Sequence, residues 1–144
     1  MAKRSAQPGP YALDPRLAAD SHPVHALPLC ELRLMDDANY PWLVLVPRVA
    51  GACELIDLDA GQRRELTEEI DITLRLLRET FRPHKLNVTA LGNLVPQLHV
   101  HVIARFEHDP AWPAPVWGRV AARPYSPEAL VERIAVLQAA MPER

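Results

Sequence analysis

Several features are scarce in this chain of 144 residues, and each scarcity excludes a class of protein. Its 2 cysteines, Cys30 and Cys53, are too few for a disulfide framework and lack metal-ligand spacing, so we expect buried free thiols in a reducing cytoplasm. No apolar run approaches the roughly 20 residues that span a bilayer, and the start of the chain has charge but no apolar signal segment. The sequence therefore predicts a cytoplasmic protein without a membrane partner.

An excess of charge of either sign is also missing. Lys and Arg number 16 against 18 Asp and Glu, so the overall field does not recruit nucleic acid. Any affinity for a phosphate group must come from a local site. With 49% hydrophobic and 24% charged residues, the chain has the composition of an ordinary folded protein, and its length fits one domain.

Proline, by contrast, is abundant. The 15 prolines amount to about twice the usual frequency of ~5%. Many lie near residues 8–28 and 110–127, where we expect extended arms and turns around a compact centre. We predict an N-terminal tail over residues 1–22, one domain over residues 23–122 and a C-terminal helix packed on it over residues 123–144.

The patterning of apolar residues predicts strands over residues 29–35, 41–47, 85–90 and 97–105, the first two forming a hairpin and the second lying centrally. Apolar residues at three- and four-residue steps predict one long amphipathic helix after Asp59. Capping pairs predict a helical turn at Asp14-Pro15 and a last helix at Ser126-Pro127. This order implies an α+β fold, with helices packed on an antiparallel sheet.

The stretch QLHVHVIAR, residues 97–105, is the most unusual in the chain. As a strand it would place Gln97, His99 and His101 on one face. Two histidines at this spacing can be ordinary core or half-exposed residues. They can also bind a metal ion, but the third ligand is missing, because Gln97 is a poor zinc ligand and His108 lies in another segment.

Phosphoryl chemistry is the third interpretation of the two histidines. A neutral imidazole is a competent nucleophile at physiological pH, and a neighbouring histidine can hydrogen-bond a phosphate oxygen. The preceding loop contains Gly92 and Asn93, which would bring backbone N–H groups and an amide to the same place. Such an arrangement suits an anion.

The stretch NVTALGNLVPQLHVHVIAR (87–105), with the upstream PWLVLVPR (41–48), resembles a bacterial branch of the HIT (histidine triad) family of nucleotide hydrolases and transferases. The resemblance covers about residues 29–118 and implies a HIT-like antiparallel sheet. The family motif is His-φ-His-φ-His-φ-φ, where φ is hydrophobic. Here the last two histidines match, whereas Gln97 stands in place of the first.

The resemblance also implies roles for individual residues. His99 would be the nucleophile that attacks the α-phosphorus of a nucleotide, and His101 would hydrogen-bond the phosphate oxygens. Gln97 cannot pass a proton, but its amide could still orient His99. Asn93 and Asn87 would line the nucleotide pocket.

Three further positions stay open between two interpretations. Asp36 and Asp37 are the candidates for binding the ribose hydroxyls, or they form a solvated hairpin turn. Trp42 stands near the place of a family histidine and is either core or a wall of the pocket.

The segment FEHDPAWPAPVWG, residues 106–118, carries too much apolar surface to stay in water and should dock on protein. Its Trp112 and Trp117 would contact the leaving group or base, or fill a groove or interface. In the family two subunits join into one continuous sheet, which implies a homodimer.

We therefore predict hydrolysis of a nucleoside-monophosphate–X bond, as in a dinucleoside polyphosphate or a nucleoside phosphoramidate. The reaction would pass through a covalent nucleotidyl-His99 intermediate, without a metal or another cofactor. The alternative is a nucleotide-binding or regulatory protein in which Gln97 has left binding without useful turnover.

Overall fold

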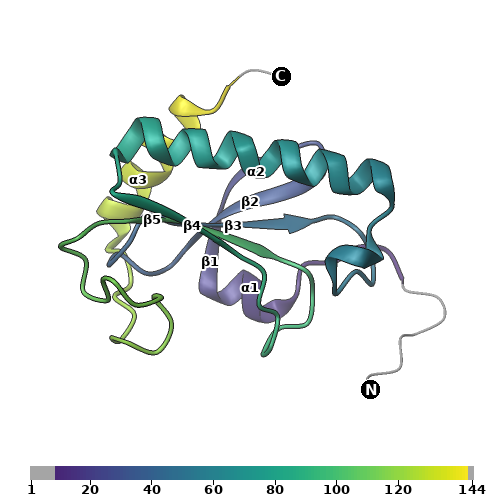
Figure 1. Ribbon diagram of the computed structural model, residues 1–144, viewed down its shortest axis with the longest axis horizontal. Coiled ribbons are helices and arrows are strands. Elements are labelled where there is room, and N and C mark those ends of the chain that lie inside the picture. Colours follow the sequence, from purple (N-terminus) through teal and green to yellow (C-terminus); the bar gives the residue numbers. More distant parts are fainter. Residues whose placement is uncertain (1–8, 143–144) are drawn as a thin grey trace.

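The computed structural model describes residues 9–142 as a five-stranded antiparallel sheet with three helices, which confirms the α+β prediction (Figure 1). In spatial order β1-β2-β3-β5-β4, the strands are β1 (Ser21–Ala26), β2 (Cys30–Met35), β3 (Trp42–Pro47), β5 (Val100–Arg105) and β4 (Lys85–Thr89). The helices are α1 (Pro15–Asp20), α2 (Ala60–Phe81) and α3 (Pro127–Ala140), with a short 3-10 helix η1 (Leu55–Asp57).

The predicted hairpin and the central strand are both present. β2 pairs with β3, and β3 lies in the middle of the sheet between β2 and β5. The sequence did not predict β1, which pairs with β2 and is interrupted by a register shift between Pro23 and His25. α1 and the start of β1 precede residue 23, so regular structure begins within the predicted tail over residues 1–22. Residues 1–8 of that tail lie outside the described residues.

The helix boundaries follow from local capping. The Asp59 side chain accepts a hydrogen bond from the backbone N–H of Gln62, and the Gln62 side-chain oxygen accepts one from the backbone N–H of Asp59. Arg82 ends α2 in the left-handed conformation, at φ 51°, directly before a proline. Asp14 and Ser126 cap α1 and α3, each with proline at the first helical position, as predicted.

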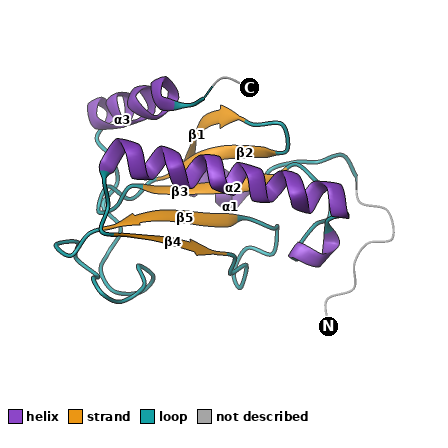
Figure 2. Cartoon of the chain, turned by 45° about the horizontal axis from the view of Figure 1, so that its top comes forward, coloured by secondary structure: helices purple, strands orange, loops and turns teal. Residues whose placement is uncertain are grey.

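Both long helices cover the same face of the sheet (Figure 2). The apolar stripes of α2 and α3 pack there on alternate residues of the strands, which forms the main hydrophobic core. The core includes Leu32, Leu45, Val100, Val102, Leu66, Leu77 and Leu137. Cys30 lies in this core as expected, whereas Cys53 is only half-buried because it lies in the loop that leads to η1.

The opposite face of the sheet has a thinner cover. Figure 1 shows α1 on the other side of the sheet from α2. Leu17 of α1, with Tyr11 and Leu13 before it, packs on Val44 and Val46 of β3. The proline- and tryptophan-rich segment docks beside them and packs against Trp42 at the start of β3, as its apolar composition predicted. Within residues 9–142, no helix combines the length and apolar character that crossing a membrane requires.

Candidate functional site

The two histidines meet on the face of the sheet that α2 does not cover. His101 lies on β5, opposite Val44 of β3 and Thr89 of β4. His99 comes just before β5, which begins at Val100, so the predicted strand over residues 97–105 is too long at its start. The side chains are 6% and 4% exposed, and the centroids of the two rings are 4.9 Å apart. The structure therefore brings His99 and His101 together.

The ring of His99 is oriented by the backbone. Its Nδ1 lies 2.7 Å from the carbonyl oxygen of Gln97. A carbonyl oxygen only accepts hydrogen bonds, so Nδ1 must carry the proton and donate it. In a neutral imidazole the other nitrogen, Nε2, then keeps its lone pair. His99 is thus held in the tautomer that a nucleophile requires.

The ring of His101 is held in the complementary way. The indole Nε1–H of Trp42 donates to His101 Nδ1 at 2.9 Å, which leaves the ring proton on Nε2. Burial and, to a smaller extent, the neighbouring His99 lower the pKa of His101 to about 3. His101 therefore remains a neutral N–H donor at every pH at which most enzymes work.

The sequence predicts that the side-chain amide of Gln97 orients His99, but in the structure this amide bonds the segment before α1. Its side-chain oxygen accepts from the backbone N–H of Asp14 at 2.8 Å, and its side-chain nitrogen donates to the carbonyl of Ala12 at 2.9 Å. Arg16 adds a hydrogen bond to the carbonyl of Leu94. The amide of Gln97 thus fastens the segment before α1 to the motif, whereas the backbone carbonyl of Gln97 orients His99.

The loop before the motif forms one wall of a cavity of about 290 Å³. Gly92, with φ 71°, lines this cavity together with His99. The neighbouring Asn93 is exposed. The other lining residues are mostly apolar: Cys53, Glu54, Leu55, Ile56, Ala90, Leu91 and Leu98.

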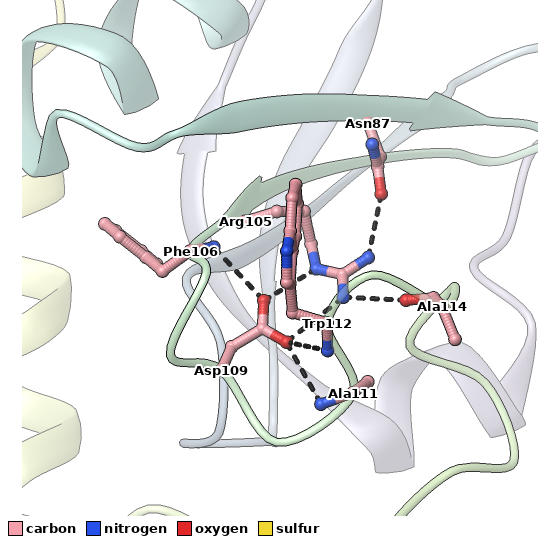
Figure 3. Close-up of polar contacts among 7 residues, drawn as sticks. All are labelled: Asn87, Arg105, Phe106, Asp109, Ala111, Trp112 and Ala114. Carbon is pink, nitrogen blue, oxygen red and sulfur yellow. Dashed lines mark hydrogen bonds and ion pairs between the residues drawn. The ribbon is translucent and has the colours of Figure 1, made fainter.

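Asn87 belongs to a second polar cluster on the same face, two positions along β4 from the partner of His101. Its side-chain oxygen accepts from Arg105 Nη1 at 3.0 Å (Figure 3). Arg105 also forms an ion pair with Asp109, whose Oδ2 lies 2.8 Å from Nε, and donates to the carbonyl of Ala114 at 2.7 Å. The cluster ties the segment after β5 to the sheet.

This anchoring brings Trp117 to the histidines. The ring of Trp117 lies edge-on to His101, with centroids 5.0 Å apart, and edge-on to Trp42 at 5.5 Å. Trp112 instead packs near Arg105 and His84. The sequence singled out both tryptophans but gave no signal that separates them, because their positions depend on the Arg105 anchor.

The two candidate ribose-binding carboxylates lie elsewhere. Asp36 and Asp37 follow β2, which runs in the same direction as β5, so they lie at the Arg105 end of the sheet and not at the His99 end. Asp36 accepts from the backbone N–H of Tyr125, and Asp37 from those of Asn39 and Arg123. Their contacts fasten the segment that leads to α3, and the structure does not bring them to the histidines.

Metal ligands do not gather at this site. Across residues 9–142, no group of three or more His, Cys, Asp or Glu side chains is arranged to hold a metal ion. The indole of Trp42 lies against His101, and the cavity beside His99 is lined mostly by apolar side chains, together with Cys53 and Glu54. The arrangement offers one lone pair, on His99 Nε2, next to one N–H donor, on His101 Nε2.

Comparisons with known proteins agree with this geometry. A family model described as HIT domain matches residues 16–108. A solved histidine triad protein from Bradyrhizobium japonicum is 44% identical, with 92% of this chain and 99% of that chain covered and a TM-score of 0.90. One from Marinobacter aquaeolei is 44% identical, with coverages of 92% and 97% and a TM-score of 0.90.

A third solved histidine triad protein, from Sinorhizobium meliloti, is 42% identical, with coverages of 90% and 96% and a TM-score of 0.88. The comparison with curated proteins gave no match. The matches to solved structures extend over nearly the whole of each chain, so they include both the motif and the segments that cover it.

Proposed function

Because this chain belongs to the HIT family, we propose that it is a nucleotide hydrolase that cleaves a nucleoside-monophosphate–X bond. The substrate class is a dinucleoside polyphosphate, a nucleoside phosphoramidate or a similar ester or anhydride. His99 acts as nucleophile and His101 as hydrogen-bond donor. The observation that carries the proposal is the pair of opposite tautomers, with a lone pair on His99 Nε2 beside an N–H on His101 Nε2.

The reaction proceeds in two displacements at phosphorus. In the first, the lone pair of His99 Nε2 forms a bond to the α-phosphorus, the P–X bond breaks, and X leaves with the electron pair and takes a proton from solvent. The positive charge that develops on the ring of His99 is stabilised by the carbonyl oxygen of Gln97, which accepts from Nδ1. In the second, water attacks the phosphorus and gives up a proton to solvent, the P–N bond breaks with its electron pair returning to His99 Nε2, and the nucleoside monophosphate is released.

His101 and the loop before the motif stabilise the charge on the phosphoryl group. The Nε2–H of His101 points its dipole at the place where a phosphate oxygen gains charge. The backbone around Gly92, which shares the cavity with His99, adds N–H groups to the same anion. Since His101 is neutral and buried, its donor is already oriented before the substrate binds.

The test is the release of AMP from an adenosine phosphoramidate and from a diadenosine polyphosphate, with a chelator present. We expect turnover by the wild-type protein and a loss of at least about 10³-fold in His99→Ala. His108→Ala is the matched control, because His108 is exposed on the segment after β5, and it should keep wild-type turnover. An acid quench with substrate labelled at the α-phosphate should trap label on the wild-type protein and not on His99→Ala.

The engaged amide of Gln97 is the observation that favours a second candidate function. Because this amide cannot relay a proton, a nucleotide-binding or regulatory protein without turnover is the alternative. It predicts measurable AMP binding in calorimetry, with no AMP release and no trapped label. That result would refute the hydrolase and support the binding protein.

We further propose that two copies of the chain pair through β4. This strand is at an open edge of the sheet, next to the motif strand β5, and Val88 on it is 45% exposed. Pairing of β4 with a second β4 would give the continuous sheet that the family resemblance implies. Light scattering at several concentrations should give twice the chain mass, and Val88→Pro, which removes an edge N–H, should shift it toward the monomer.

A further inference from the structure

Trp42 is fixed in place more firmly than a side chain that only fills space. It is the first residue of β3, is 7% exposed and pairs with Ile103, so it lies diagonally across the strands from His101. Its ring packs edge-on between Tyr40, at 6.2 Å, and Trp117, at 5.5 Å. The indole therefore has little freedom to turn away from His101.

The chemistry of the indole makes this contact directional. An indole N–H only donates a hydrogen bond, and Trp42 Nε1 donates to His101 Nδ1 at 2.9 Å. Protonation of His101 at Nδ1 would place two N–H groups against each other. An imidazole in the place of Trp42 could change its own protonation state to follow His101, whereas an indole cannot.

We infer that Trp42 is a positioning residue for the proposed reaction, because its N–H holds His101 in the tautomer that carries the proton on Nε2. Trp42 thereby fixes which atom of His101 is offered to the substrate, without entering the reaction itself. This inference rests on the proposed function. Within residues 9–142 the ring of His101 faces the neutral indoles of Trp42 and Trp117, and His99 is the titratable group that acts on it.

The tautomer can be read without any substrate. In protein labelled with ¹⁵N-histidine, two-dimensional NMR distinguishes a protonated ring nitrogen from one that carries a lone pair. We expect His101 to show a protonated Nε2 and a bare Nδ1 in the wild-type protein. Trp112→Phe is the matched control, because it makes the same change in the segment that packs near Arg105 and His84, and it should leave this pattern unchanged.

In Trp42→Phe the aromatic ring remains and the donor is lost. Loss of one hydrogen bond should shift the ratio of His101 tautomers by about three- to tenfold and raise the pH at which His101 protonates by about half to one unit. At neutral pH, where His101 is uncharged with or without the indole, kcat for AMP release should fall, because a smaller fraction of the protein offers the Nε2–H donor.

Two results would overturn the inference. One is a Trp42→Phe protein with a native-like NMR spectrum in which His101 keeps both its tautomer and its titration. The other is a changed tautomer with an unchanged kcat at neutral pH, which would leave Trp42 without an effect on the reaction. If Trp42→Phe does not fold, the wild-type protein decides, because a wild-type His101 with its proton on Nδ1 also contradicts the inference. Failure of the proposed function is seen separately, as no AMP release by the wild-type protein.

Discussion

Asp109→Ala removes one half of an ion pair that is almost completely shielded from water. The side chains of Arg105 and Asp109 are only 2% and 3% exposed, and Nε lies 2.8 Å from Oδ2. Asp109 also accepts from the backbone N–H groups of Phe106, Ala111 and Trp112. The change would leave a buried guanidinium without its counter-charge and three backbone donors without their acceptor.

Removing one partner of a buried pair costs about 3–5 kcal/mol. Arg105 would keep its hydrogen bonds to Asn87 and to the carbonyl of Ala114, so we expect a loss near the lower end, about 3 kcal/mol of the free energy of unfolding. A domain of this kind is stable by about 5–15 kcal/mol, so the protein should remain folded but with a much lower urea midpoint.

The pair is charged at neutral pH. Burial by itself would raise the pKa of Asp109, but the hydrogen bonds from Arg105 and the backbone N–H groups outweigh it and lower the pKa. The stabilisation by Asp109 is therefore present above the ordinary carboxyl pKa of about 3.9 and is lost as the pH falls below it. Measurements at pH 7 report the intact pair.

The chain contains a matched control for burial. Asp71 and Arg75 on α2 have the same four-residue spacing and the same atom pair at 2.9 Å, but their side chains are 53% and 70% exposed. Asp71→Ala should leave the urea midpoint unchanged, because water and salt screen an exposed pair. Equal shifts of the midpoint in Asp71→Ala and Asp109→Ala, with equal m values, would refute the argument that burial decides the strength of the pair.

Three further predictions concern other parts of the chain. Gln97→Ala should destabilise the protein by about 1–2 kcal/mol through two lost hydrogen bonds and speed proteolytic cleavage near Ala12. Gln97→Asn, which keeps the amide on a side chain one carbon shorter, shows whether the amide must reach that far. Unchanged cleavage in Gln97→Ala would contradict the anchoring role of the amide. The pKa of His101 is about 3 in the folded protein and about 6.5 when unfolded, so as the pH falls from about 6 to about 3 this residue should lower wild-type stability by about 1.4 kcal/mol per pH unit, with a smaller slope in His101→Asn. Ser126→Ala should cost about 1 kcal/mol by removing the cap of α3 and leave AMP release unchanged, which a thermal melt and the turnover assay check together.

The parts of the fold that the sequence predicted are those whose determinants are local. The capping box at Asp59 and the apolar stripe after it are readable within one segment, as are the caps of α1 and α3. β1 escaped prediction because its sequence, SHPVHA, has no apolar alternation and contains a proline. Its strand conformation depends on pairing with β2, which supplies the hydrogen-bonding partner from outside.

At the candidate site, the residue types were predictable and the connections between them were not. The sequence identified His99, His101 and Gly92, which the structure brings together. The hydrogen bond between Trp42 and His101 depends on the register of β3 against β5, which no single segment encodes. The same holds for Gln97, whose partners lie more than 80 positions away in the sequence.

The two faces of the sheet are covered unequally, and this separates stability from substrate preference, so that evolution can change one without the other. The face under α2 and α3 holds the main core, and substitutions there alter stability. The opposite face carries the motif under short segments, namely the stretch before α1 and the stretch after β5. Away from their anchors at Gln97, Arg105 and Asp109, the exposed positions of such segments tolerate substitution and insertion far better than packed helices do. A lineage with this architecture can therefore acquire a new substrate preference by changing the cover, while the same core keeps the protein folded.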